Sequence, residues 1–79
     1  MGSLTELFRV LSDPTRQKIY RVLLQEELCV CELAAIFSVS QSAISQHLRR
    51  LRSIHLVNGR RRGQWVFYRG DPRPLEEAI

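Results

Sequence analysis

The stretch that decides the fold reads Ser38-Val39-Ser40-Gln41-Ser42-Ala43-Ile44-Ser45-Gln46-His47-Leu48-Arg49-Arg50-Leu51 in this chain of 79 residues. Ile44, Leu48 and Leu51 recur at helical spacing, so they form one apolar stripe that must face a core. Residues 38–40 form a tight turn, and Ser40 is a good N-cap residue. We therefore expect a helix over about residues 41–53 that packs by one face against the rest of the protein.

The opposite face of this helix carries short polar groups and one arginine, and no acid: Ser42, Ser45, Gln46, Arg49 and Ser53. Such a face can lie against a major groove without repulsion and contact both bases and phosphates. Gln41 and Ser42 stand in the first turn, which enters the groove most deeply in helix-turn-helix docking. Arg50 and Arg52 flank the face, and we expect them to meet phosphate.

Three further helices are predicted before this stretch. The first is indicated by apolar residues at i, i+3, i+4 and i+7, namely Leu4, Leu7, Phe8 and Leu11. The second covers about residues 14–25, because Asp13 is a good N-cap and the φ of Pro14 is preset for a first helical turn. The third covers about residues 31–37. The apolar residues 28–30 before it could be briefly extended.

Two strands are predicted after the polar helix, over residues 56–61 and 64–69, around a turn at Gly63. Arg60, Arg61 and Arg62 stand at the tip of this hairpin. Trp65, Phe67 and Arg69 alternate with Val66 and Tyr68, so that one face packs inward, and we favour core packing of the aromatic residues over base stacking. A last short helix starts at Pro74. Helices followed by a hairpin predict a mainly α fold with a small β-hairpin, a winged helix-turn-helix, as a single domain over residues 1–79.

The charge balance points to a polyanion as partner. Twelve Lys and Arg residues stand against eight Asp and Glu, and eleven of the twelve are Arg, which donates bidentately to phosphates and base edges. A solvated basic face is the alternative. Double-stranded DNA is favoured because the short turn, the polar helix and the arginine-tipped hairpin occur together. We expect Arg61 and Arg62 of the hairpin to contact phosphates.

Several classes of protein are disfavoured. No apolar run approaches the roughly 20 residues of a membrane helix. Two cysteines one residue apart do not make a secreted disulfide framework, so we expect a cytoplasmic protein with reduced thiols. The sequence shows no nucleophile–base pair and no glycine loop that could bind phosphate, so we expect neither an enzyme nor an organic cofactor.

The two cysteines, Cys29 and Cys31, directly precede and open the predicted third helix. Residues i and i+2 point the same way in an extended segment but diverge on a helix. The thiols can therefore converge only if Cys29 lies in the strand-like entry and Cys31 at the helix cap. Their spacing suits one soft ion, whereas tetrahedral zinc needs two more ligands. The two histidines are not evident candidates for these two further ligands, and we expect His47 to be a structural hydrogen-bonding group. Inert buried thiols are the alternative.

Four segments together resemble the ArsR/SmtB family of metalloregulatory repressors: residues 11–16, 28–33, 40–51 and 62–68. The resemblance covers nearly the whole chain. Its Cys-Val-Cys element is similar to that of the branch that senses trivalent arsenic and antimony. The resemblance implies a homodimer that represses an arsenical-resistance operon and leaves DNA when As(III) or Sb(III), or another thiophilic ion, binds Cys29 and Cys31.

Two features depart from the family pattern. Many arsenic sensors carry a third cysteine where this chain has Ala34, so a third ligand would be a solvent oxygen, a small thiol or another group. The chain also stops where the C-terminal dimer helix of the family should continue, so we expect the zinc site of some relatives to be absent or truncated. For the dimer, we expect the terminal helices to pair across a two-fold axis, through the stripe that starts at Leu4 and through Leu75 and Ile79.

Two other functions stay open at this stage. The first is a repressor that senses oxidants or persulfides through its thiols. A disulfide between residues i and i+2 is strained, because their Cα atoms lie about 6.6 Å apart in extended chain, so oxidation would need a polysulfide link or a second subunit. The second is a constitutive DNA-binding protein whose thiols are structural.

Overall fold

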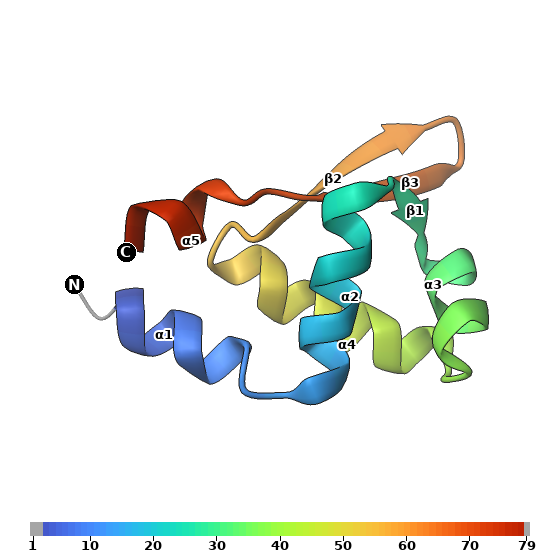
Figure 1. Cartoon of the computed structure of the whole chain (residues 1–79). Coiled ribbons are helices and arrows are strands. Elements are labelled where there is room, and N and C mark those ends of the chain that lie inside the picture. Colours follow the sequence, from blue (N-terminus) through green and yellow to red (C-terminus); the bar gives the residue numbers. More distant parts are fainter. Residues whose placement is uncertain (1–2, 79) are drawn as a thin grey trace.

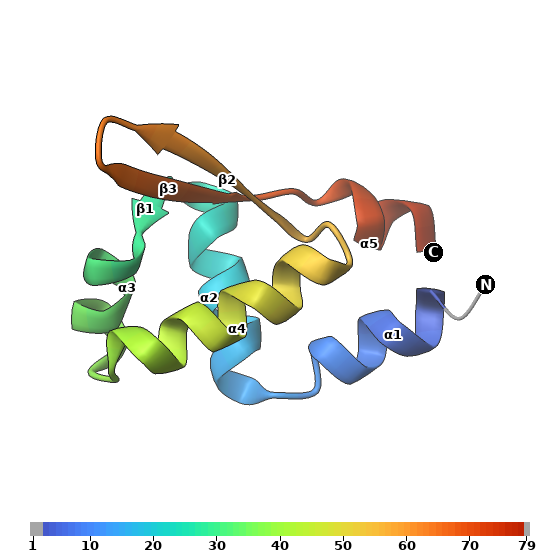
Figure 2. The same cartoon turned by 180° about the vertical axis from the view of Figure 1, so that it is seen from behind.

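The computed structural model (Figures 1 and 2) describes residues 3–78. Within them it contains, in chain order, α1 (Ser3–Val10), α2 (Pro14–Gln25), β1 (Leu28–Cys29), α3 (Val30–Phe37), α4 (Gln41–Ser53), β2 (Val57–Arg62), β3 (Trp65–Gly70) and α5 (Arg73–Ala78). Helices dominate, as predicted. The hairpin strands each lie one residue later than predicted, whereas α3 and α5 each begin one residue earlier.

Local capping chemistry fixes the starts of α2 and α4. The Asp13 carboxylate accepts the backbone N–H of Arg16 at 3.0 Å, and Pro14 occupies the first turn. This hydrogen bond holds the pKa of Asp13 below its usual value. The Ser40 hydroxyl oxygen accepts the backbone N–H of Ala43 at 3.0 Å. Both helices have the bounds that the sequence predicted.

The sheet has three antiparallel strands in the order β1-β3-β2, one more than the predicted hairpin. The extra strand β1 pairs Leu28 with Tyr68 and Cys29 with Phe67. Strands β2 and β3 form the wing, which turns at Gly63 with a φ of 63° that glycine adopts without strain. The segment before the thiol-bearing helix is thus joined directly to the wing.

The core lies where α2, α3 and α4 meet below the sheet, and its fully buried side chains include Ile19, Leu23, Leu33, Ile44, Leu48, Leu51 and Leu56. The end of β3 approaches α2 so closely that a Cβ on Gly70 would lie 2.9 Å from the backbone nitrogen of Leu24. Tyr20, a buried residue of α2, donates its hydroxyl to the carbonyl of Asp71 at 2.7 Å. Helix α2 therefore holds the C-terminal end of β3 in place.

Helices α1 and α5 lie together at the end of the molecule away from the tip of the wing (Figures 1 and 2). Leu7 is buried within the chain, so it is not free for the dimer contact that its stripe predicted. Leu4 and Phe8 remain 48% and 65% exposed, and Leu75 is half-buried. Ile79, the other residue predicted at this contact, lies outside the described residues.

Candidate functional site

Helix α4 separates an apolar face from a polar one as its sequence predicts. Ile44, Leu48 and Leu51 are buried, and they hold the helix against the core. The predicted DNA-contact residues of this helix are all exposed, namely Gln41, Ser42, Ser45, Gln46, Arg49 and Arg50. Figure 2 shows α4 running across the near side of the molecule, below the wing. Its polar face is thus open to a large ligand.

An open groove runs between α4 and the wing. Ser45, Arg49 and Arg52 line it from α4, and Tyr68 lines it from β3. The sequence placed Tyr68 among the residues that pack inward, and it does pack against the core while one side reaches this groove. A tyrosine has an apolar ring and a polar tip, which suits both environments. Tyr68 was therefore missed as a groove residue, and its amphipathic side chain was the available signal.

The three arginines of β2 differ in their surroundings. Arg60 makes an ion pair with Glu27 at 3.2 Å, so part of its charge is already compensated. Arg61 and Arg62 are exposed and have no acidic partner among the described residues. The guanidinium of Arg62 lies 5.7 Å from the centre of the Phe67 ring, within the range of a cation–π contact. Arg61 and Arg62 are thus the wing charges most available to a polyanion.

Two expectations about side chains near these surfaces are wrong. Trp65 does not pack into the core but is 48% exposed beside the wing turn. Trp65 and Tyr68 point to opposite faces of β3, and Tyr68 is the one that packs against the core. His47 does not form the expected structural hydrogen bond at Nδ1, which is buried without a partner in the part of the chain that the structure describes.

The cap of α3 is Cys29 and not Cys31, so the arrangement in which the two thiols would converge is met only in part. Cys29 ends β1 in an extended conformation, and Cys31 lies in the first turn of α3. Cys29 is only 7% exposed, whereas Cys31 is exposed, and neither forms a disulfide. The Glu32 carboxylate accepts the backbone N–H of Cys29 at 3.0 Å and so caps α3. The strand-to-helix junction therefore holds one covered and one accessible thiol.

A third protein ligand does not accompany the thiols. Residues 3–78 contain no group of three or more His, Cys, Asp or Glu side chains that could hold a metal ion. Two thiolates nevertheless fit a soft, thiophilic ion that completes its coordination with a non-protein ligand. This donor set does not fit a structural zinc ion, which takes four ligands.

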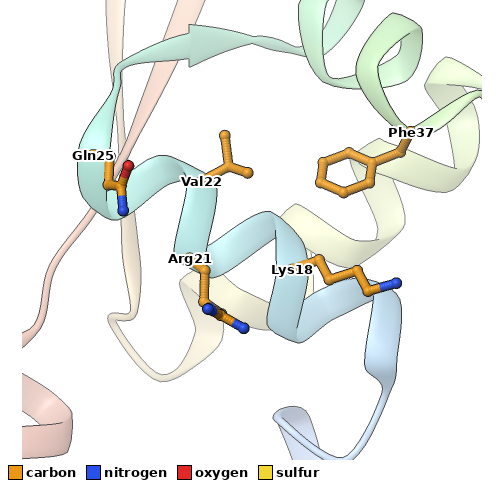
Figure 3. A pocket seen from close by; sticks show the side chains of 5 residues that line it. All are labelled: Lys18, Arg21, Val22, Gln25 and Phe37. Carbon is orange, nitrogen blue, oxygen red and sulfur yellow. The ribbon is translucent and has the colours of Figure 1, made fainter.

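A shallow pocket between α2 and α3 is separate from the thiols (Figure 3). Lys18, Arg21, Val22 and Gln25 line it from α2, and Phe37 points from α3 toward Val22. The pocket holds neither a thiol nor an acid. Phe37 thus fixes the end of α3 on α2 and leaves the beginning of α3 as the part that carries the cysteines.

The model of a bacterial regulatory protein family, the arsR family, matches residues 13–58. The chain belongs to this family. It is 49% identical over 65 residues to a transcriptional repressor SmtB homolog of Synechocystis. The aligned residues make up 82% of this chain and 49% of that protein. It is 45% identical over 67 residues to the arsenic resistance transcriptional regulator ArsR1 of Pseudomonas putida. This alignment includes 84% of this chain and 52% of that protein.

The chain thus spans about half the length of these two relatives. Both relatives are named as transcriptional regulators. Among solved structures, the chain is similar to reduced HlyU from Vibrio cholerae, with a TM-score of 0.84, 36% identity, and coverage of 96% of this chain and 81% of that one. The winged helix-turn-helix fold is therefore established. Within residues 3–78, no helix has the length and apolarity to cross a membrane.

Proposed function

We propose that this ArsR-family protein is a cytoplasmic, homodimeric repressor that binds operator DNA and releases it when As(III) or Sb(III) binds Cys29 and Cys31. One observation carries the proposal. The two thiols flank the start of α3, and α3 packs on α4, which presents the polar face. The name of the relative from Pseudomonas putida, an arsenic resistance regulator, supports the choice of effector.

For DNA binding, we assign base contacts to the polar face of α4 and phosphate contacts to its flanks and to the wing. Gln41, Ser42, Ser45 and Gln46 are exposed and can exchange hydrogen bonds with base edges, and Arg49 can reach a base or a phosphate. Arg50, Arg61 and Arg62 supply positive charge at the periphery. A dimer would place two such helices about one DNA turn, roughly 34 Å, apart on a pseudo-palindrome.

For the effector, arsenous acid reacts with two thiols. Two As–S bonds replace two As–OH bonds, and the two thiol protons leave with these hydroxides as water. The remaining hydroxide keeps the third position, which agrees with Ala34 in place of a third cysteine. A pair of thiolates suits this soft ion without further protein ligands.

The release step follows from helix geometry. Residues i and i+2 diverge on a relaxed helix, so one ion held by Cys29 and Cys31 must tilt or unwind the first turn of α3. The capping bond from Cys29 to Glu32 lies in that turn. Leu33, fully buried next to it, passes the strain to Ile44 on α4. Allosteric coupling of ordinary size, about 5- to 150-fold in affinity, is enough to empty an operator.

The test replaces each thiol by a hydroxyl of similar size. We expect Cys29→Ser and Cys31→Ser to bind an operator, selected from a random duplex library, as tightly as the wild type. Both variants should stay bound in As(III) and Sb(III), whereas the wild type dissociates, as measured by fluorescence anisotropy. Dissociation of either variant at the As(III) concentration that releases the wild type would show that the thiol pair is not the sensor.

A thiol redox sensor is the second candidate, and Cys31 favours it. Its thiol is exposed and therefore accessible to an oxidant, and the similar structure of HlyU is described as the reduced form. Titration of the operator complex with polysulfide separates the two candidates. Release by polysulfide but not by As(III) would establish the redox sensor. Release by neither would establish a constitutive DNA-binding protein with structural thiols.

A further inference from the structure

Strand β1 joins the thiol segment to the wing through its backbone. Cys29 stands directly opposite Phe67 in the ladder between β1 and β3. Residues that face each other across two strands project to the same side of the sheet, with Cβ atoms about 4.5–5.5 Å apart. The Cys29 side chain and the Phe67 ring are therefore neighbours on one face.

The same face leads on to the tip of the wing. In the ladder between β2 and β3, Phe67 stands opposite Arg60, and Trp65 stands opposite Arg62. These four residues share the sheet face that Cys29 occupies, and the Arg62 guanidinium lies over the Phe67 ring. Arg61 points to the other face, because side chains alternate along a strand.

We propose that Phe67 is a positioning residue that couples the thiol pair to Arg62, so that effector binding acts on the wing as well as on α4. This inference rests on the proposed function. To share an ion with Cys31, the Cys29 sulfur must turn toward the first turn of α3. The Phe67 ring then loses the neighbour that packs beside it and shifts, and the Arg62 guanidinium loses the ring face that orients it.

A second tie joins the same two segments. Glu27, two residues before Cys29, pairs with Arg60, two residues before Arg62. The thiol segment is therefore attached to the wing by two backbone pairs and one ion pair. A displacement of this segment therefore acts on the wing as well as on α3. The coupling through α3 and α4 does not need Phe67, so the two routes can be separated by mutation.

Trp65, the single tryptophan of the chain, stands opposite Arg62 and is half-exposed, so its fluorescence reports on this face. The first measurement follows Trp65 emission while arsenite is added to the protein without DNA, and counts reactive thiols with a chromogenic disulfide reagent. We expect an emission change that saturates as two thiols per chain become protected. In Phe67→Leu the thiols should still become protected, but the emission change should fall by half or more.

The second measurement compares two arginine variants of equal charge change. Arg61→Gln and Arg62→Gln each remove one exposed positive charge, so both should weaken operator binding. The decisive quantity is the ratio of operator affinity without and with arsenite. We expect Arg61→Gln to keep the wild-type ratio and Arg62→Gln to reduce it by roughly 2- to 30-fold, the range typical of residues that carry coupling. Both residues are exposed, so neither variant depends on a repacked core.

The outcomes distinguish this inference from the proposed function. Thiols that stay reactive in arsenite would overturn the proposed function and the coupling with it. Protected thiols and a released operator, together with equal ratios in the two arginine variants, would overturn the coupling through Phe67 alone. A reduced ratio in Arg62→Gln only, with the altered Trp65 response in Phe67→Leu, would establish it.

Discussion

Asp13 combines two physical roles in one side chain, because its carboxylate caps α2 and also titrates. The capping bond to the Arg16 N–H lowers the pKa of Asp13 from its model-peptide value of 3.8. A carboxyl whose pKa is lower in the folded state stabilises the fold fully above the unfolded value, and this contribution is lost as pH falls through the folded value. Asp13 should therefore contribute to stability at neutral pH and make the protein sensitive to acid.

Two substitutions separate these roles. We expect Asp13→Ala to lower the free energy of unfolding at pH 7 by about 1 kcal/mol, as for other lost N-caps. Asp13→Asn keeps a capping oxygen, so it should stay near wild-type stability at pH 7 and lose less stability than the wild type below pH 4. Urea unfolding at several pH values measures both. Asp71, whose pKa is held at about 2 chiefly by its hydrogen bonds with Arg73, titrates in all three proteins and cancels in the comparison. Parallel acid profiles for wild type and Asp13→Asn would show that the capping bond does not depend on charge.

At the scale of elements, α4 and the wing present different chemistry to DNA, so their variants should fail differently. Gln46→Ala removes an exposed amide that can pair with a base edge, and it should change sequence preference by about 1–3 kcal/mol at one position. Arg61→Gln removes an exposed charge, and it should weaken binding to all duplexes alike and reduce the salt slope by about one. Binding to a set of operator variants at several salt concentrations measures both effects. Loss of specific binding alone in Arg61→Gln would reverse the two roles.

The elements that the sequence predicted accurately are those whose boundaries depend on nearby residues. Asp13 with Pro14 and then Ser40 fix the starts of α2 and α4, because an N-cap acts within three residues. Strand β1 has only two residues and is defined by pairing with Tyr68 and Phe67, far along the chain. No local pattern could specify that pairing, so the sequence predicted a hairpin instead of a three-stranded sheet.

In the candidate site too, features that depend on nearby residues were predicted, and features that depend on distant pairing were not. The apolar run over residues 28–30 suggested an extended Cys29, which the structure confirms, whereas the third helix begins one residue earlier than predicted and places Cys31 inside its first turn. That Cys29 is buried and Cys31 exposed depends on the β1–β3 pairing and could not be predicted locally. The exposure of Trp65 was missed because strand alternation separates two faces without telling which of them meets the core, and in the structure it is the face of Tyr68.

At the scale of the whole molecule, the exposed apolar side chains Leu4 and Phe8 lie on α1, away from the proposed DNA-contact surface on α4 and the wing. Leu4 and Phe8 are 48% and 65% exposed, next to a cleft that Leu4, Ile54 and Pro74 line. Large apolar residues that stay exposed side by side commonly mark an interaction surface. A two-fold axis through α1 and α5 would cover this surface and leave both copies of α4 free for one DNA duplex.

The prediction for this assembly changes one exposed residue on α1. We expect the wild-type chain to sediment with the mass of two chains at micromolar concentration, and Phe8→Glu with the mass of one, because a carboxylate cannot be buried in an apolar contact without a partner. Phe8→Glu should also bind a full operator far more weakly than the wild type, since each half-site then binds alone. Ile36→Glu is the matched control, because Ile36 is 55% exposed on α3, away from α1 and α5. A Phe8→Glu protein with the mass of two chains, or an Ile36→Glu protein with the mass of one, would move the dimer contact away from the terminal helices.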